Sequence, residues 1–360
     1  MNDIPWSQRL LHRLDPEAAH LVALSALKLG LAPMPAPYED PILATRIWNL
    51  DFASPIGLAA GFDKDAEVVD PMLRAGFGFV EASSVTPKPQ PGNPKPRLYR
   101  LTEDRAVINR FGFNSQGIDA YAERLRARRR RGGARGIVGA NLGKNKETVD
   151  GAADYVIGIR AVAGLADYLV CNISSPNTPG LRGMQARAPI EDLLGRVLAA
   201  RGEATPAGCK PPPLLAKVGP DLDAQQVQDI AEVALATGLD GLIIGNTTIE
   251  RPSGLLGRDA AQAGGLSGAP LLPRANACLA DFARATGGRL PIIGCGGVSS
   301  GAHAYAKIRA GASLVQLYSA LVFYGLPLVN QIKRDLAALL RRDGFASLGE
   351  AVGADLRGSS

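Results

Sequence analysis

The chain has 360 residues, 46% of them hydrophobic and 21% charged, which is the composition of a globular protein with a sizeable core. The formal net charge of +6 suits an anionic ligand or an anionic membrane surface. The chain has 3 histidines and 4 cysteines, and no cysteine pair has CxxC spacing. A His-rich metal site and a redox dithiol are therefore poorly supported, and we expect no metal.

The first 40 residues differ from the rest of the chain. Asp15 followed by Pro16 is typical of a helix start, and Gly30 is typical of a helix end. An apolar stripe at helical spacing precedes this segment: Trp6, Leu10, Leu11 and Leu14. We expect a two-helix extension over residues 1–40, either a cap packed on the next domain or a module facing a membrane or a hydrophobic ligand. The start lacks the plan of a signal or transit peptide.

Eight short apolar runs follow, each closed by a polar residue or glycine. Their nearly continuous hydrophobicity is typical of parallel strands buried on both faces. The runs are Ile56–Gly61, Phe79–Val85, Ile137–Gly143, Tyr168–Ser174, Leu214–Gly219, Gly241–Asn246, Pro291–Gly296 and Ser313–Tyr318.

Helical segments lie between most of these runs, for example Asp223–Thr237 and Pro270–Thr286. Strand and helix alternating eight times predict an α/β fold, a closed (β/α)₈ TIM barrel over residues 41–341. An open doubly wound sheet is the alternative. The basic run Arg124–Arg131 ends one predicted helix and is interpreted as a solvated face. Residues 342–360 are expected to form a poorly structured tail.

Polar or glycine-rich residues follow every predicted strand. Reactive groups of such barrels lie at the carboxyl ends of the strands, so eight such ends predict a ligand site at one mouth. In strand order they are Gly61 to Lys64; Ser83, Ser84 and Thr86; Asn141 and Lys144; Asn172, Ser174, Ser175 and Asn177; Lys217; Asn246 to Thr248; Gly294, Gly296 and Gly297; and Tyr318 and Ser319.

The chemistry of these residues indicates two kinds of binding. Gly296, Gly297, Ser319 and the segment 264–268 favour a phosphate cradle, because glycines let backbone N–H groups approach an anion. The amides suit a flat heterocycle with alternating N–H and C=O edges; they are Asn109, Asn114, Asn141, Asn172, Asn177 and Asn246. Lys64 and Lys217 suit anionic oxygens or the negative charge that develops on a reduced flavin.

Seven motifs together resemble the dihydroorotate dehydrogenase family, and more narrowly its membrane-associated, quinone-dependent class 2. The resemblance covers about residues 1–335 in order. The motifs are GLAAGFDKD (57–65), TPKPQPGNPKPRLYRL (86–101), INRFGFNS (108–115), NLGKNK (141–146), CNISSPNTPGLR (171–182), GGLSG (264–268) and GASLVQLYS (311–319).

The resemblance implies bound FMN, oxidation of dihydroorotate to orotate in pyrimidine (UMP) synthesis, and a quinone as electron acceptor. It implies Ser175 as catalytic base, where class 1 enzymes use cysteine, with Thr178 and a water near Phe113 relaying the proton. The implied FMN contacts are Ala60, Gly61, Lys64, Ser84, Asn141, Asn172, Lys217, Gly245, Gly268, Gly297, Tyr318 and Ser319. The implied orotate contacts are Lys64, Asn109, Arg110, Phe111, Gly112, Phe113, Asn172, Asn177, Asn246 and Thr247.

Some positions depart from the family pattern. They are Ser84, Phe111, Ser115, Gly219 and Gly245. None removes a charged or catalytic group, so they put single contacts in doubt rather than the activity. The resemblance further implies a peripheral protein on the cytoplasmic face of a bacterial-type inner membrane, with no nucleic-acid partner.

Three alternatives remain open from the sequence. One is a class 1-like enzyme that uses fumarate or NAD, against which Ser175 and residues 1–40 both argue. Another is an FMN barrel acting on a different pyrimidine. The third is a binding or scaffold barrel without turnover.

Overall fold

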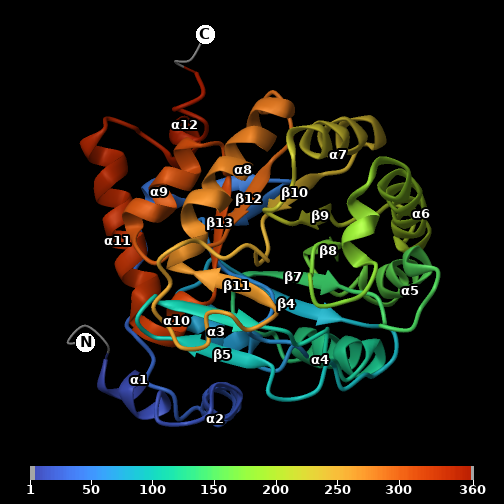
Figure 1. Cartoon of the computed structure of the whole chain (residues 1–360). Helices are drawn as coiled ribbons and strands as arrows, with labels where there is room; N and C mark the ends of the chain where they lie inside the picture. The colour runs from blue at the N-terminus through green and yellow to red at the C-terminus, as the bar shows by residue number, and fades with distance from the viewer. Residues whose placement is uncertain (1–4, 358–360) are drawn as a thin grey trace.

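The computed structural model describes residues 5–357 and has a closed barrel of eight parallel strands at its centre (Figure 1). The last barrel strand pairs with the first, with Val315 opposite Ile56. The (β/α)₈ prediction is therefore confirmed, and an open sheet is excluded. The barrel strands, in spatial order, are β3 (Ile56–Leu58), β4 (Phe79–Val85), β7 (Ile137–Leu142), β8 (Tyr168–Asn172), β9 (Leu214–Val218), β10 (Gly241–Ile244), β12 (Ile292–Cys295) and β13 (Leu314–Leu317).

All eight apolar runs contain a barrel strand, but most of the strands end before the predicted run does. β3 stops at Leu58 rather than Gly61, and β8 stops at Asn172 rather than Ser174. The polar residues that close each run leave the hydrogen-bonded ladder and turn into the loops above the barrel. The predicted runs thus included the first residues of the site loops.

Helices surround the barrel as the alternating pattern predicts. Asp223 caps α7 (Ala224–Thr237) with a full capping box, in which its side chain accepts from Gln226 N at 2.8 Å. The remaining helices around the barrel are α3 (Val69–Arg74), α4 (Ile118–Arg130), α5 (Gly151–Val162), η2 (Leu181–Gln185), α6 (Arg187–Ala204), η3 (Ala269–Leu271), α8 (Leu272–Ala285), α9 (Gly301–Arg309), α10 (Ala320–Tyr324) and α11 (Pro327–Arg342).

A hairpin absent from the sequence predictions closes the amino end of the barrel. After the short turn η1 (Pro41–Leu43), β1 (Thr45–Ile47) pairs with β2 (Leu50–Phe52). Phe52 packs edge-on against Phe79 at 5.5 Å, and the Trp48 indole donates to Asp240 O at 2.7 Å. With this end filled by aromatic side chains, a ligand can enter only at the carboxyl mouth.

A second unpredicted element, a three-stranded antiparallel sheet, lies over that mouth. It consists of β5 (Leu98–Leu101), β6 (Ala106–Asn109) and β11 (Gly265–Gly268). Within it Asn109 lies opposite Gly265. The sheet therefore brings the INRFGFNS and GGLSG motifs together, although they are far apart along the chain.

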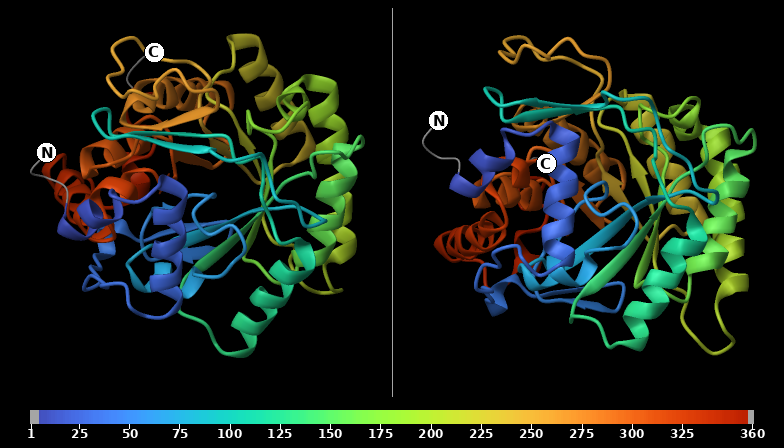
Figure 2. Two further views of the ribbon diagram at one scale, coloured as in Figure 1. Left: turned by 60° about the horizontal axis from the view of Figure 1, so that its bottom comes forward. Right: turned by 90° about the horizontal axis from the view of Figure 1, so that it is seen from below.

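The two predicted N-terminal helices are present as α1 (Trp6–Leu11) and α2 (Pro16–Lys28), which lie beside the carboxyl mouth (Figure 2). Asp15 caps α2 and accepts from Glu17 N at 3.0 Å. α2 packs on β5, and α1 packs on α10. Across residues 5–357, no helix has both the length and the apolar character needed to cross a membrane.

The C-terminal segment corrects the expectation of a poorly structured tail. Residues 343–357 pack on the barrel through a short helix, α12 (Leu348–Ala351), and Leu348 is fully buried. Arg309 forms an ion pair with Asp355, and Gly353 N donates to Ile308 O at 3.0 Å. The sequence pattern did not predict this packing because the segment contains only a few apolar residues.

Candidate active site

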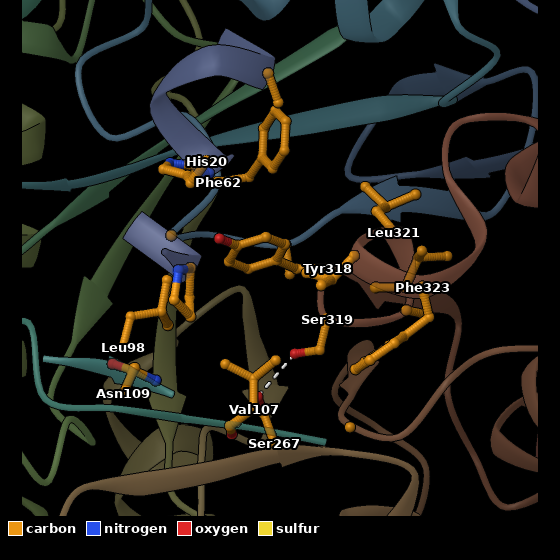
Figure 3. Close-up of a pocket in the computed structure, with 18 of the residues that line it drawn as sticks. His20, Phe62, Leu98, Val107, Asn109, Ser267, Tyr318, Ser319, Leu321 and Phe323 are labelled. Carbon is orange, nitrogen blue, oxygen red and sulfur yellow. Dashed lines mark hydrogen bonds between the residues drawn. The ribbon is translucent and has the colours of Figure 1, made fainter. Parts of the chain in front are cut away.

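One cavity of about 540 Å³ lies between the barrel mouth, the covering sheet and the N-terminal helices. Its inner part is lined by amides, hydroxyls and lysines from the strand ends, and its outer part by the apolar sides of α1, α2 and α10. Figure 3 shows part of this cavity, with His20, Phe62 and Tyr318 on one side and Asn109, Ser267 and Ser319 on the other. The cavity is therefore polar at one end and apolar at the other.

Most of the FMN, orotate and catalytic residues that the resemblance implies line this cavity. Three of them do not: Asn141 lies fully buried beneath it, Thr178 is buried in the loop after β8, and the Arg110 side chain points outward to Tyr99 and Ala263 O. The predicted residues that line the cavity are Ala60, Gly61, Lys64, Ser84, Asn109, Phe111, Gly112, Phe113, Asn172, Ser175, Asn177, Lys217, Gly245, Asn246, Thr247, Gly268, Gly297, Tyr318 and Ser319.

Ser175 lies in the loop that leaves β8, with 8% of its surface exposed. Its hydroxyl accepts from Asn177 N at 3.3 Å, which holds the oxygen near the loop backbone. Thr178 Oγ1 is buried and has no hydrogen-bond partner. Phe113 is held at a φ of +55°, a strained conformation for a bulky residue. Such strain is concentrated at functional sites.

The amides beneath the cavity form a connected hydrogen-bond network. Asn172 Nδ2 donates to Ser84 Oγ at 2.9 Å, and Asn172 Oδ1 accepts from Asn246 Nδ2 at 3.3 Å. Asn246 Nδ2 also donates to Ser174 Oγ at 2.9 Å. Each amide is thereby fixed in orientation, so the wall presents a defined pattern of donors and acceptors.

A buried carboxylate that sequence reasoning missed supports Lys217. Glu81 is fully buried inside the barrel and accepts from Asn141 Nδ2 and from Gln316 Nε2, both at 2.7 Å. Its Oε1 lies 4.0 Å from Lys217 Nζ. A buried lysine needs such a counter-charge. The position of Glu81 inside the predicted buried run Phe79–Val85 could have signalled its role, because a buried acid requires a partner.

Lys64 sits above the ring of Phe111, with Nζ 4.1 Å from the ring centroid. Burial lowers the pKa of Lys64 to about 8, while Glu17 opposes this effect. The side-chain amine of Lys64 is therefore close to half protonated at mildly alkaline pH. Phe111, noted as a departure from the family pattern, supplies a cation–π surface to this lysine.

Glycines and hydroxyls form a cradle where β11, β12 and β13 end. Ser319 Oγ donates to Ser267 Oγ at 2.8 Å, as drawn in Figure 3. Gly268 has a φ of +98°, and an added Cβ would lie 2.3 Å from Arg105 O. At Gly297, with a φ of +77°, a Cβ would lie 2.5 Å from Leu272. Only glycine fits these positions, and the backbone is open to an anion.

The apolar end is built around α2. His20 contacts Phe62 edge-on at 5.4 Å and lies 6.3 Å from Tyr318. Burial, followed by the nearby Lys64 charge, lowers the pKa of His20 to about 3, so it is neutral. Large apolar side chains on the outer surface of the two helices, Leu10 of α1 and Leu21 of α2, are 58% and 53% exposed. The helices thus present apolar surface both to the cavity and to the exterior.

Comparison with known proteins places the chain in one family. The sequence profile named Dihydroorotate dehydrogenase matches residues 42–340. A protein named dihydroorotate dehydrogenase (quinone) from Azorhizobium caulinodans is 57% identical over 99% of this chain and 100% of its own length. The mouse protein named dihydroorotate dehydrogenase (quinone), mitochondrial, is 51% identical over 98% of this chain and 89% of its own.

A solved structure agrees with these sequence matches. The crystal structure of Eimeria tenella DHODH in complex with ferulenol superposes with a TM-score of 0.93 at 40% identity, covering 97% of this chain and 99% of the other. The match extends over the barrel, the covering sheet and the N-terminal helices, since it spans nearly all of both chains. The chain belongs to the dihydroorotate dehydrogenase family.

Proposed function

We propose that this protein oxidises (S)-dihydroorotate to orotate with FMN as cofactor and a membrane quinone as electron acceptor, a step of UMP biosynthesis. The observation that carries the proposal is the continuous cavity, in which Ser175 and the amide wall occupy one end and the apolar sides of α1 and α2 the other. An enzyme that transfers electrons from a polar to an apolar substrate needs both environments within reach of one cofactor.

The residues present fit FMN. The cradle of Ser267, Gly268, Gly297 and Ser319 would hold its phosphate, because the glycines expose backbone at an open, polar surface. Lys217 would meet the edge of the flavin ring on which negative charge develops, with the Glu81 carboxylate 4.0 Å from its Nζ. Thr247 Oγ1, on the residue implied as an orotate contact, is likewise a buried polar atom without a protein partner, as expected where a ligand supplies one.

The remaining amides would bind the pyrimidine. Asn177 Nδ2 donates to Asn109 O at 3.1 Å, which ties the β8 loop to the end of β6. Asn172 and Asn246 face the same space from the barrel wall. Lys64 would pair with the substrate carboxylate, which is the strongest type of hydrogen bond available here.

The protein's part in the chemistry is to move one proton. FMN, when bound, accepts the hydride that leaves one carbon of the substrate. Ser175 Oγ would take the proton from the neighbouring carbon, and a serine needs an acceptor for its own proton because its hydroxyl is scarcely ionised at neutral pH. Thr178 Oγ1, which is buried without a partner in the same loop, and a water near Phe113 would together accept that proton and pass it on.

The apolar end would admit the quinone. Its lining comes from α1, α2 and α10, and the outer apolar side chains of α1 and α2 would lie against a membrane. We propose a peripheral position on the cytoplasmic face of that membrane. A fumarate- or NAD-linked enzyme has no use for this apolar half. That half therefore favours the quinone over the soluble acceptors.

The test separates the two half-reactions. Purified yellow protein is mixed anaerobically with dihydroorotate, and the flavin absorbance is followed; a quinone with an apolar tail is then added. We expect bleaching followed by recovery of the absorbance. A colourless protein would favour a scaffold barrel, and a yellow protein that dihydroorotate does not bleach would favour another pyrimidine.

A further inference from the structure

Helix α2 makes a buried ion pair with the loop in front of β5. Arg97 Nη2 donates to Glu17 Oε1 at 2.7 Å, and Arg97 Nε donates to both Glu17 oxygens at 3.2 Å. The two side chains are 9% and 11% exposed. The pair therefore joins α2, whose apolar side lines the outer part of the cavity, to the loop before β5.

Arg97 also holds in place the loop of residues 91–93, which contacts residues at the polar end of the cavity. Its Nη1 donates to Pro91 O at 2.7 Å and to Asn93 O at 2.9 Å. Asn93 Nδ2 in turn donates to Arg110 O at 3.0 Å and to Asn177 O at 3.1 Å. An unbroken chain of polar contacts thus runs from Glu17 to the backbone two residues after Ser175.

A second route leads from the same ion pair to Lys64. The Arg97 guanidinium lies 5.2 Å from the centroid of Phe111, and Lys64 Nζ lies 4.1 Å from it. Two cations therefore share one ring, and Glu17 is the carboxylate bound to one of them. Burial raises the pKa of Glu17, but the hydrogen bond and charge of Arg97 outweigh burial, so the pKa is lowered and Glu17 is ionised.

We infer that Glu17, on the quinone-side helix, is a positioning residue for the pyrimidine site. It fixes Arg97, and Arg97 holds the Asn93 loop and Phe111 in the geometry that binds orotate. The inference rests on the proposed function for the identity of the ligand. It goes beyond that function because it makes binding at the polar end depend on a residue of α2.

The charge of Lys64 supplies a pH readout. A negative neighbour favours the protonated form of a lysine, so removal of Glu17 lowers the pKa of Lys64 further. The ionisable groups that face Lys64 are Glu17 and His20 on α2, Arg97 before β5, and Asp63 and Asp65 in its own loop. Orotate binding should then weaken at a lower pH in a Glu17 variant than in the wild type.

The test measures the dissociation constant of orotate on FMN-loaded full-length protein by the change in flavin absorbance. The measurement is repeated from pH 6 to pH 10 in steps of about one unit. Glu17→Gln should raise the dissociation constant at neutral pH by roughly 3- to 30-fold and move the midpoint of its pH dependence downward. Glu17→Asp keeps the charge but shortens the side chain, so its dissociation constant for orotate should lie between those of the wild type and Glu17→Gln. If Glu17→Gln yields no FMN-loaded protein, Glu17→Asp carries the comparison.

Lys28→Gln is the matched control. Lys28 lies at the other end of α2 and tethers it to Glu67 at 2.7 Å, away from Arg97. Lys28→Gln should leave the dissociation constant of orotate unchanged. Wild-type orotate affinity in the Glu17 variants, or an equal loss in Lys28→Gln, would overturn the inference. A wild type that binds orotate but is not bleached by dihydroorotate would instead overturn the proposed function.

Discussion

The two ends of the cavity differ in how they are built. The polar end is assembled from strand termini and the loops after them, and hydrogen bonds such as Asn172 to Ser84 fix each side chain. The apolar end is assembled from helix faces, where residues such as Ala23 and Leu27 contribute shape but no directed bond. Polar recognition therefore depends on particular atoms, and apolar recognition on open volume.

This difference predicts how each end responds to substitution. Loss of one atom at the polar end removes a bond or a proton acceptor, with large effects. At the apolar end small deletions should be tolerated, and only added volume should be harmful.

The largest effect is expected at Ser175. Ser175→Ala should retain FMN and bind orotate but slow flavin reduction by roughly 100- to 10,000-fold, the usual contribution of a positioned base. Stopped-flow absorbance under anaerobic conditions measures this rate. Ser175→Cys should recover part of it with a shifted pH profile, because a thiol ionises more easily. A rate near that of the wild type in Ser175→Ala would remove Ser175 from the mechanism.

Lys217→Ala should weaken FMN retention. The substitution removes a charged donor and leaves Glu81 buried without its nearby cation, which costs about 1.5–3 kcal/mol of binding, or roughly 10- to 100-fold in affinity. Reconstitution of the apoprotein followed by flavin fluorescence measures the dissociation constant. Glu81→Gln with Lys217→Met should recover more of the protein's stability than Lys217→Ala alone. Unchanged FMN affinity in Lys217→Ala would make the lysine purely structural.

Added volume at the apolar end should block the quinone alone. Ala23 lines the cavity from α2, and Ala18 lies exposed on the same helix. Ala23→Trp should reduce turnover with a long-tailed quinone by about tenfold, since overpacking costs about 1–3 kcal/mol. Bleaching by dihydroorotate and turnover with a soluble dye should persist. Equal quinone turnover in Ala23→Trp and the control Ala18→Trp would contradict the passage.

This substitution separates the half-reactions better than removal of the helices does. Deleting residues 1–38 would also remove Glu17, and Arg97 would lose the carboxylate that fixes it. A truncated protein would therefore lose orotate binding together with the quinone passage.

The smallest effect is a pH dependence in the wild type. Because burial lowers the pKa of Lys64 to about 8, the ammonium is present below that pH and is lost as the pH rises through it. Orotate affinity should be constant near pH 6 and fall by up to about tenfold per pH unit above 8. Isothermal titration measures it, and Lys64→Met should show weak binding at every pH. A flat profile to pH 10 would mean that Lys64 does not meet the carboxylate.

The sequence predicted the barrel because its strands are buried on both faces, which leaves long apolar runs such as Phe79–Val85. It predicted the polar end because strand termini converge by geometry. The sequence did not predict the β1–β2 hairpin or the β5–β6–β11 sheet. Their strands have only 3 or 4 residues, and apolar and polar residues alternate only weakly along them. Arg97 escaped because its partner Glu17 lies 80 residues away in the chain.

The central claim is that one cavity passes electrons from a polar substrate to an apolar acceptor. A single anaerobic sample tests it: dihydroorotate is added to the yellow protein, and a long-tailed quinone is added after the flavin has bleached. The account predicts full bleaching, then reoxidation that Ala23→Trp slows and Ala18→Trp does not. Reoxidation that is equally fast in both variants, or a flavin that dihydroorotate leaves oxidised, would contradict it.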